Sequence, residues 1–245
     1  MLKLTDVTWL YQHLPMRFTL SVQQGERIAV LGPSGAGKST LLNLIAGFLQ
    51  PASGSIAIDN RDFTNAPPAK RPVSMLFQEN NLFTHLTVRQ NIALGMHPGL
   101  RLNDAQREKL EVIAAQMGIA EFIDRLPGEL SGGQRQALTL LMATMNKPKL
   151  LLLDEHTAAL DPKTALKVLT LSAKIVEENH LTTMMITHNM KDAIKYGNRL
   201  IMMHEGHIIY DVSGEEKKNL QVSDLLAKFQ IASGGEFAND RMILS

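Results

Sequence analysis

The chain contains no cysteine among its 245 residues. Disulfide bonds, thiolate metal sites and cysteine nucleophiles are therefore excluded, and the absence fits a reducing compartment. An excess of one sign of charge is also missing, because 25 Lys and Arg stand against 24 Asp and Glu. This balance holds on both sides of residue 135, so the sequence has no basic pole of the kind that binds nucleic acid.

Long hydrophobic runs are absent as well. Continuous apolar stretches such as Leu150–Leu153 are far shorter than the roughly 18 residues that a membrane-spanning helix needs. The first residues contain no apolar segment of the kind found in a secretory signal, so we expect none. Apolar residues make up 44% and charged residues 20%, which is typical of a soluble globular protein with one large domain or one domain and a subdomain.

Predicted strands and helices alternate through most of the chain. Alternating apolar residues predict half-buried strands at 2–9 and 18–22, and apolar runs predict buried strands at 28–31 and 149–154. Further strands are expected at 56–58, 73–77 and 183–187, and a hairpin at 200–210 that turns at Glu205 and Gly206. Helical spacing is clearest at 39–48, 101–117, 130–145, 164–178 and 223–230, where Ser223 would cap the last helix. The alternation predicts an α/β fold with a mostly parallel core sheet, an antiparallel subdomain and an inserted helical one.

A glycine-rich loop carries the strongest local signal. It follows an apolar strand and opens a helix. Its residues are Gly32, Pro33, Ser34, Gly35, Ala36, Gly37, Lys38, Ser39 and Thr40. Such glycines let successive backbone N–H groups face one anion, and the dipole of the following helix adds positive potential. We expect Lys38 to reach the β- and γ-phosphates of a nucleotide and Ser39 to ligate Mg²⁺. The alternative is a glycine-rich turn with a chance lysine.

Two adjacent carboxylates form the second signal. Leu150–Leu153 run directly into Asp154 and Glu155. In an open α/β sheet the carboxyl ends of the strands form the ligand-binding edge, so both side chains would lie there. We expect Asp154 to hold Mg²⁺ through water and Glu155 to polarise an attacking water. Alone the pair is weak, because many buried strands end in an acid that caps the next helix. With the glycine-rich loop it predicts a magnesium–nucleotide site.

A third segment predicts a second anion site. The segment combines three features that bind anions: the hydroxyl of Ser131, the amides of Gly132 and Gly133, and the N-terminus of the helix that includes Gln134. One triphosphate needs only one phosphate-binding loop. We therefore expect this segment to act on a nucleotide bound by another copy of the chain. The alternative is an ordinary helix capped by Ser131.

These three segments, in this order, resemble those of the ATP-binding subunits of ABC transporters, and the resemblance covers nearly the whole chain. It implies that Tyr11 stacks on adenine, Gln78 contacts Mg²⁺ and the attacking water, and His188 contacts the γ-phosphate. It also implies that Asp161, in the loop 159–161, lies at the nucleotide. Taken singly, Tyr11 also fits a strand-end aromatic, Gln78 a surface loop residue and His188 a helix cap.

The resemblance also implies an architecture and a set of partners. The core would be a P-loop NTPase (RecA-like) fold, with a helical subdomain at about residues 88–145 and a C-terminal extension at about 214–245. Two chains would lie head to tail with two ATP molecules between them, each between Gly32–Thr40 of one chain and Ser131–Gln134 of the other. The enzyme would hydrolyse ATP with Mg²⁺ to drive separate membrane permease subunits, and indirectly a substrate-binding protein. It would lie in the cytoplasm on the inner face of the cell membrane.

The use of basic residues changes along the chain. Residues 1–135 hold nine Arg and four Lys, whereas residues 136–245 hold two Arg and ten Lys. The first part resembles the ATPases of bacterial thiamine uptake transporters. The second resembles a different ABC uptake ATPase and has His156 where the family usually has proline after the catalytic glutamate. This pattern favours a chimera joined at Leu130–Gln136, and the alternative is one divergent lineage.

Other functions remain open at this point. The chain could serve another uptake system, since thiamine follows from resemblance alone. A soluble ABC ATPase of DNA repair or translation usually has long coiled coils or two cassettes, and this sequence has neither. A catalytically silent fusion would act only as a binding module. Residues 214–245 are polar with one short predicted helix, and fit either a partner contact or a loose tail.

Overall fold

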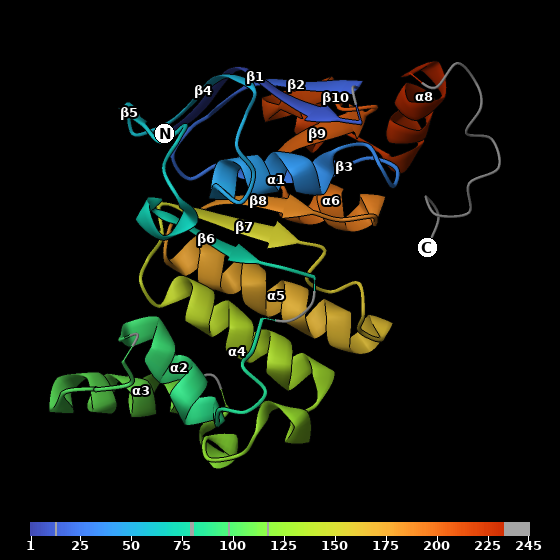
Figure 1. Cartoon of the computed structure of the whole chain (residues 1–245). Coiled ribbons are helices and arrows are strands. Elements are labelled where there is room, and N and C mark those ends of the chain that lie inside the picture. Colours follow the sequence, from blue (N-terminus) through green and yellow to red (C-terminus); the bar gives the residue numbers. More distant parts are fainter. Residues whose placement is uncertain (13, 79–80, 98, 117, 233–245) are drawn as a thin grey trace.

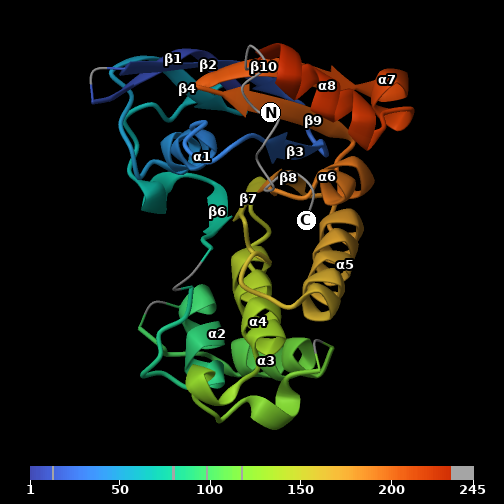
Figure 2. The ribbon, with the colours of Figure 1, turned by 90° about the vertical axis from the view of Figure 1, so that its right-hand side faces the viewer.

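Two sheets lie at one end of the molecule and a group of helices at the other (Figures 1 and 2). The computed structural model describes residues 1–12, 14–78, 81–97, 99–116 and 118–232. The first sheet is antiparallel, in the order β2-β1-β4-β5. Its strands are β1 (Leu2–Tyr11), β2 (Leu14–Val22), β4 (Ser53–Ile58) and β5 (Arg61–Asp62).

The second sheet has six strands in the order β10-β9-β3-β8-β7-β6. They are β3 (Arg27–Leu31), β6 (Val73–Leu76), β7 (Leu150–Asp154), β8 (Thr182–Ile186), β9 (Arg199–His204) and β10 (His207–Ser213). All neighbours pair in parallel except β9 and β10, which form an antiparallel hairpin. Every residue of β7 and β8 is buried. Burial on both faces of a parallel sheet explains the run of four leucines in β7, and in β8 two buried threonines precede the apolar residues.

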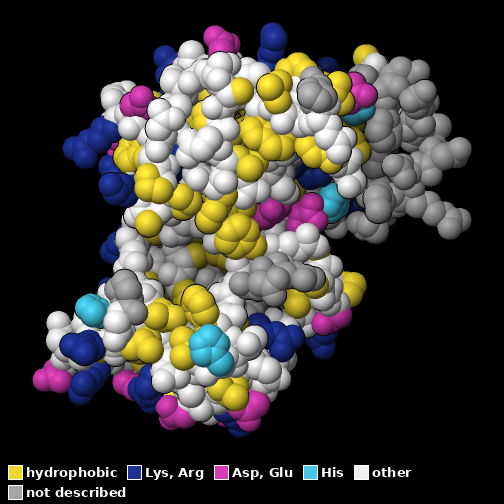
Figure 3. Space-filling model, viewed as in Figure 1, with side chains coloured by type: hydrophobic (Ala, Val, Ile, Leu, Met, Phe, Trp, Pro, Cys, Tyr) yellow, Lys and Arg dark blue, Asp and Glu magenta, His cyan; other side chains and the backbone are white. Residues whose placement is uncertain are grey.

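Helices α2, α3 and α4 form the far end of the molecule (Figure 2). Their bounds are Val88–Met96, Asp104–Gln116 and Gly132–Thr144. They have a hydrophobic cluster of their own, which includes Val88, Ile92, Leu110 and Leu138. Short 3₁₀ turns lie at Pro68–Lys70, Ala120–Phe122 and Pro127–Glu129. Figure 3 shows hydrophobic side chains gathered on the surface where this helical part meets the sheets.

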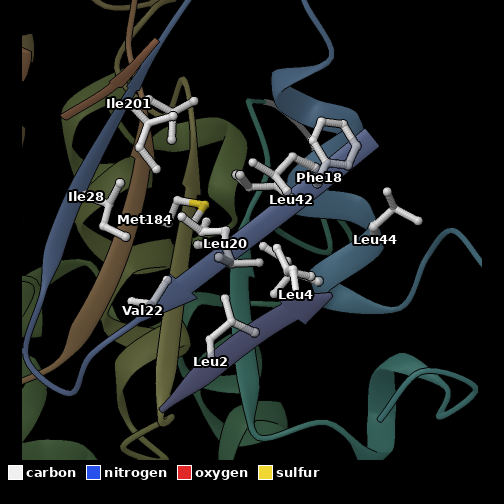
Figure 4. Packing of buried hydrophobic residues seen from close by; sticks show 14 of the residues in the cluster. Leu2, Leu4, Phe18, Leu20, Val22, Ile28, Leu42, Leu44, Met184 and Ile201 are labelled. Atoms are coloured by element: carbon white, nitrogen blue, oxygen red, sulfur yellow. The ribbon is translucent and has the colours of Figure 1, made fainter. Parts of the chain in front are cut away.

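The main core lies between the two sheets, around helix α1 (Lys38–Ala46). Figure 4 shows Leu4 and Phe18 of the antiparallel sheet lying with Leu42 of α1 and Met184 of β8 in one cluster. All four side chains are 0–1% exposed. Burying side chains of this size stabilises the fold by about 1.5–3 kcal/mol each. Helix α1 is therefore fixed on both sides, which sets the position of the loop that precedes it.

Four helices complete the structure: α5 (Pro162–Glu178), α6 (Met190–Tyr196), α7 (Gly214–Lys218) and α8 (Val222–Ala232). The α/β class expected from the sequence is confirmed, with the antiparallel sheet and the helical part where the pattern placed them. One detail was wrong. Helix α8 begins at Val222, so Ser223 lies inside it, and the Asp224 carboxylate accepts a hydrogen bond from the Gln221 N–H instead.

The region after residue 213 is packed as far as it is described. Leu225 and Phe229 of α8 are 0% and 3% exposed and belong to a cluster with residues of β3, β9 and α6. The alternative of a loose tail is therefore wrong for α7 and α8. Residues 233–245 lie outside the described residues.

Arg71 joins the end of helix α1 to the chain that leads to β6. Its side chain is 5% exposed and donates to four backbone carbonyls. These are Leu44 O and Ile45 O at 2.9 Å, Ala66 O at 2.9 Å and Thr64 O at 3.1 Å. The last carbonyls of a helix have no partner within the helix, so a buried guanidinium here supplies donors to them, in addition to the Gly47 N–H that reaches Leu44 O at 3.3 Å.

We expect Arg71→Met to lower the free energy of unfolding by about 3 kcal/mol, because buried carbonyls lose a charged donor. For a chain of this size the midpoint of thermal unfolding would fall by about 6–12 °C. Thermal and urea unfolding measure the change. Arg61→Met, at an exposed arginine of β5, is the matched control, and equal stability of the two variants would contradict the capping role.

Candidate active site

The glycine-rich loop connects β3 to α1 and is fixed by its neighbours. A Cβ atom on Gly32 would lie 2.5 Å from Met203 O of β9, so only glycine allows this approach. Gly37 begins α1 with φ +91°, a left-handed conformation that glycine adopts without strain. The loop therefore has the backbone shape that the sequence predicted for holding a phosphate at the start of α1.

Lys38 folds back over this loop. Its Nζ donates to Gly32 O at 2.8 Å and to Pro33 O at 2.9 Å. Burial lowers the pKa of Lys38, while the nearby carboxylates of Glu155 and Asp154 act in the opposite direction. The ammonium thus lies between the loop and the carboxylates at the end of β7, where phosphate charge would be bound.

Ser39 and Asp154 meet at the same point. The Ser39 hydroxyl donates to Asp154 Oδ1 at 3.2 Å. Burial raises the pKa of Asp154, the bond from Ser39 lowers it, and the neighbouring Glu155 carboxylate raises it again. A hydroxyl and a carboxylate are hard oxygen ligands, and Mg²⁺ is usually bound by one or two carboxylates together with substrate phosphates. These two side chains therefore fit a magnesium ion, whose positive charge would offset the burial of Asp154.

Glu155 and His188 form a hydrogen bond across the ends of two neighbouring strands. Glu155 Oε1 lies 2.6 Å from His188 Nε2, and their side chains are 15% and 38% exposed. The hydrogen bond from His188 lowers the pKa of Glu155 despite its partial burial. The carboxylate is therefore ionised at neutral pH, as a group that accepts a proton from water must be.

Lys38, Ser39, Glu155 and His188 line one cleft of about 640 Å³, and Asp154 lies behind its lining, in contact with Ser39. The residues lining it are Tyr11, Met16, Ser34, Gly35, Gly37, Lys38, Ser39, Thr40, Gln78, Glu155 and His188. The Tyr11 ring stacks on Trp9, with ring centroids 5.9 Å apart and planes at 29°. Gln78 also lines a second hollow of about 420 Å³ together with Gly132 and Leu160. The cleft thus brings together residues from most of the predicted nucleotide-binding segments.

The segment at Ser131 is placed elsewhere. Ser131 caps α4: its hydroxyl accepts from the Gln134 N–H at 3.3 Å, and the Gln134 side chain accepts from the Ser131 N–H at 2.8 Å. A Cβ on Gly132 would lie 2.9 Å from Leu160, and one on Gly133 2.6 Å from Thr164. Of the described residues, none from 131–134 lines the cleft. Within one chain this segment is therefore a capped helix start packed against the loop before α5 and the first turn of α5.

Asp161 does not line the cleft either. Its carboxylate caps α5 by accepting from the Thr164 N–H at 3.1 Å. Hydrogen bonds from Thr164 lower the pKa of Asp161. The structure thus gives this residue a capping role, and its expected place at the nucleotide stays a prediction.

The sequence missed two features of the site. Met16 of β2 lines the cleft, and the turn between β9 and β10 supports the glycine-rich loop. In that turn the Gly206 N–H donates to Ala36 O at 3.1 Å, while Gly206 O accepts from the Arg17 N–H at 3.1 Å. The sequence predicts a hairpin turn at Gly206, but it has no local signal that pairs this turn with a loop so far away along the chain.

Comparisons with known proteins agree with this arrangement. Residues 16–158 match the family described as ABC transporter. The thiamine import ATP-binding protein ThiQ of Shigella boydii serotype 4 is 57% identical over 216 residues, which cover 88% of this chain and 93% of the relative. ThiQ of Salmonella choleraesuis is 56% identical over 223 residues, covering 91% and 95%.

Solved structures show the same fold. The ADP conformation of an ATP-binding cassette of an ABC transporter superposes with a TM-score of 0.82 and 27% identity, covering 94% of this chain and 98% of that one. A dimeric cassette in a post-hydrolysis state, bound to ADP and phosphate, gives 0.74 and 30%, covering 87% and 98%. On the family match, the identity and the fold together, the chain belongs to the ATP-binding cassette proteins of ABC transporters.

Proposed function

We propose that this chain is the ATP-hydrolysing subunit of an importer that takes up thiamine through separate permease subunits. The observation that carries the proposal is the cleft in which Lys38, the Ser39–Asp154 pair and the Glu155–His188 pair converge. Thiamine as cargo is supported by relatives named thiamine import ATP-binding proteins, which match 88–91% of the chain.

The side chains divide the chemistry between them. Phosphoryl transfer is catalysed mainly by positioning and by stabilising charge. The loop amides and Lys38 bind the phosphates, Glu155 accepts a proton from the attacking water, and His188 orients the Glu155 carboxylate through their hydrogen bond. Ser39, Asp154 and Gln78 would hold Mg²⁺, which neutralises phosphate charge when bound. Tyr11, at the edge of the cleft, is placed to stack on the base.

A second copy of the chain completes the proposed site. Ser131–Gln134 present a helix N-terminus but do not line the described cleft of their own chain, so they are available to the nucleotide of a partner. Asp161 would approach the same interface. Dimeric cassettes with 30% identity to this chain support a dimer, and the head-to-tail arrangement is proposed from the position of Ser131–Gln134.

The permease is proposed to dock where the helical part meets the sheets (Figure 3). Phe77 and Phe83, in the segment between β6 and α2, are 37% and 53% exposed. Phe48, which is 52% exposed, contacts Phe77 edge to face. Exposed aromatic side chains are typical of the centre of protein interfaces. In the described part of the chain, no helix is long and apolar enough to span a bilayer. Docking on a permease would place the chain on the inner face of the membrane, with a substrate-binding protein as an indirect partner.

We also propose that the change in Arg and Lys usage marks a junction at Leu130–Gln136. The alignment with the Shigella protein is longer than residues 1–135, so it continues past the junction, and its 57% identity does not separate the two parts. Comparing residues 1–135 and 136–245 separately with natural sequences tests the junction. One relative close to both parts would overturn it.

Lys38→Ala should weaken ATP binding about tenfold or more, because a charge-assisted contact to phosphate contributes roughly 1.5–3 kcal/mol. Calorimetric titration with ATP and Mg²⁺ measures the dissociation constant. Lys70→Ala, at an exposed lysine, is the control. An unchanged dissociation constant in Lys38→Ala would refute the phosphate-binding role.

Glu155→Gln should retain ATP binding and lower turnover by about 10²–10⁴-fold, because the amide cannot accept the proton. ATP that is not hydrolysed would then hold two chains together, so size-exclusion chromatography in the presence of ATP should show a larger share of dimer than for wild type. Glu108→Gln, at an exposed glutamate of α3, is the control. Turnover at the wild-type rate in Glu155→Gln would show that another group activates the water.

Reconstitution tests the cargo. The chain is assembled in liposomes with the permease subunits and binding protein of a thiamine import system, and ATP turnover is measured with thiamine, without it, and with an unrelated vitamin. We expect turnover to rise severalfold with thiamine alone. Equal turnover in all three arms would exclude thiamine as cargo while leaving the ATPase assignment intact.

A further inference from the structure

His156 is a buried titratable residue for which the chemistry above has no use. It directly follows Glu155, and its side chain is only 2% exposed. Its Nε2 lies 3.1 Å from the hydroxyl of Ser172, a buried residue of α5 that is 4% exposed. A polar ring in such a place is stabilised only if it forms hydrogen bonds, so this contact fixes where the ring lies.

The direction of the hydrogen bond follows from the next link. The Ser172 hydroxyl lies 2.8 Å from Val168 O and must donate to it, because a carbonyl has no proton to give. A hydroxyl has only one proton, so Ser172 can only accept from the ring. The Nε2 of His156 therefore carries the proton, and a directed chain runs from His156 through Ser172 to the backbone of α5.

Glu155, the residue that precedes His156, has an unfavourable backbone conformation. Glu155 has φ +46°, in the left-handed region, where the Cβ of a non-glycine residue crowds the backbone. Such a conformation persists only where its surroundings hold it. On one side Asp154 is fixed in β7, between β6 and β8. On the other side the next residue, His156, is tied to α5.

We propose that His156 is a positioning residue whose hydrogen bond to Ser172 holds the Glu155 carboxylate at His188 and at the nucleotide cleft. The inference rests on the proposed ATPase function. It gives α5 a part in hydrolysis: the helix anchors the turn that carries the general base. Loosening the anchor lets Glu155 leave its left-handed conformation and turns the carboxylate away from the attacking water, without touching the residues that bind ATP.

The test compares steady-state ATP turnover and thermal unfolding in five chains. Wild type is set beside His156→Leu and Ser172→Ala, which each remove one end of the hydrogen bond. His156→Gln retains an N–H donor the same number of bonds from Cβ. Thr170→Ala is the matched control, since Thr170 also donates to the helix backbone of α5, at 2.8 Å to Leu166 O, but is exposed and has no such link to the catalytic turn.

We expect kcat to fall about tenfold in His156→Leu and Ser172→Ala, with KM for ATP within about twofold of wild type. His156→Gln should recover most of the rate, and the double variant His156→Leu with Ser172→Ala should be no slower than the slower single variant. Thr170→Ala should retain the wild-type kcat. If His156→Leu does not fold, Ser172→Ala and His156→Gln decide by the same criteria.

A kcat in Ser172→Ala and His156→Leu equal to that of Thr170→Ala would overturn the positioning role. Losses that multiply in the double variant would overturn it as well, because the two residues would then act independently. Both results leave the ATPase function standing as long as wild type turns over ATP. Absence of turnover in wild type would overturn the proposed function and this inference together.

Discussion

The register of three parallel strands is the constraint on which the active site depends. Val30 of β3 pairs with Ile186 of β8, and Ile186 pairs in turn with Asp154 of β7. The three strands therefore end in one row, and the glycine-rich loop, Glu155 and His188 all emerge at the same edge. A slip of one residue would turn every side chain of a strand to the opposite face. The fully buried apolar faces of β7 and β8 make such a slip very costly, so the core that stabilises the fold also sets the positions of the site residues.

The same burial makes the site electrostatically demanding. Lys38 and Asp154 are 5% and 9% exposed. Burial lowers the pKa of Lys38 and raises the pKa of Asp154, which favours the neutral form of each. For Lys38 the carboxylates of Glu155 and Asp154 oppose this shift. For Asp154 the hydrogen bond from Ser39 and the charge of Lys38 oppose it, whereas the charge of Glu155 adds to it. A cluster of this kind stabilises the empty fold less than apolar residues would, because the cost of desolvating charges is only partly recovered. It does provide charged groups already in place, which need little rearrangement when phosphate and a divalent cation bind.

Sequence predicted what is local and missed what is long-range. The phosphate loop, the Asp154–Glu155 pair and the capped segment at Ser131 are each contiguous, so their spacing alone gives their chemistry. The support of Ala36 by Gly206, and of His156 by Ser172, joins distant residues whose neighbours follow only from the folded topology. The cap of α8 was assigned wrongly for a different, local reason, because the sequence pattern does not fix the first residue of a helix. The helix begins at Val222, so Ser223 is its second residue and Asp224 its third, where the carboxylate accepts from the Gln221 N–H.

Gln78 links the two parts of the molecule at the cleft. It follows β6, in the segment that leads from the sheets to α2, and it lines both the nucleotide cleft and the hollow beside Gly132 and Leu160. The helical part has its own hydrophobic cluster and is joined to the sheets by only two stretches of chain, one before α2 and one after α4 (Figure 2). Helix α4 also joins the two parts, because its Leu140 is fully buried in one cluster with Leu151 and Leu153 of β7. Gln78 is thus the residue at which the proposed permease contact would meet the nucleotide cleft, while α4 links the same part of the molecule to the strands whose register positions the site.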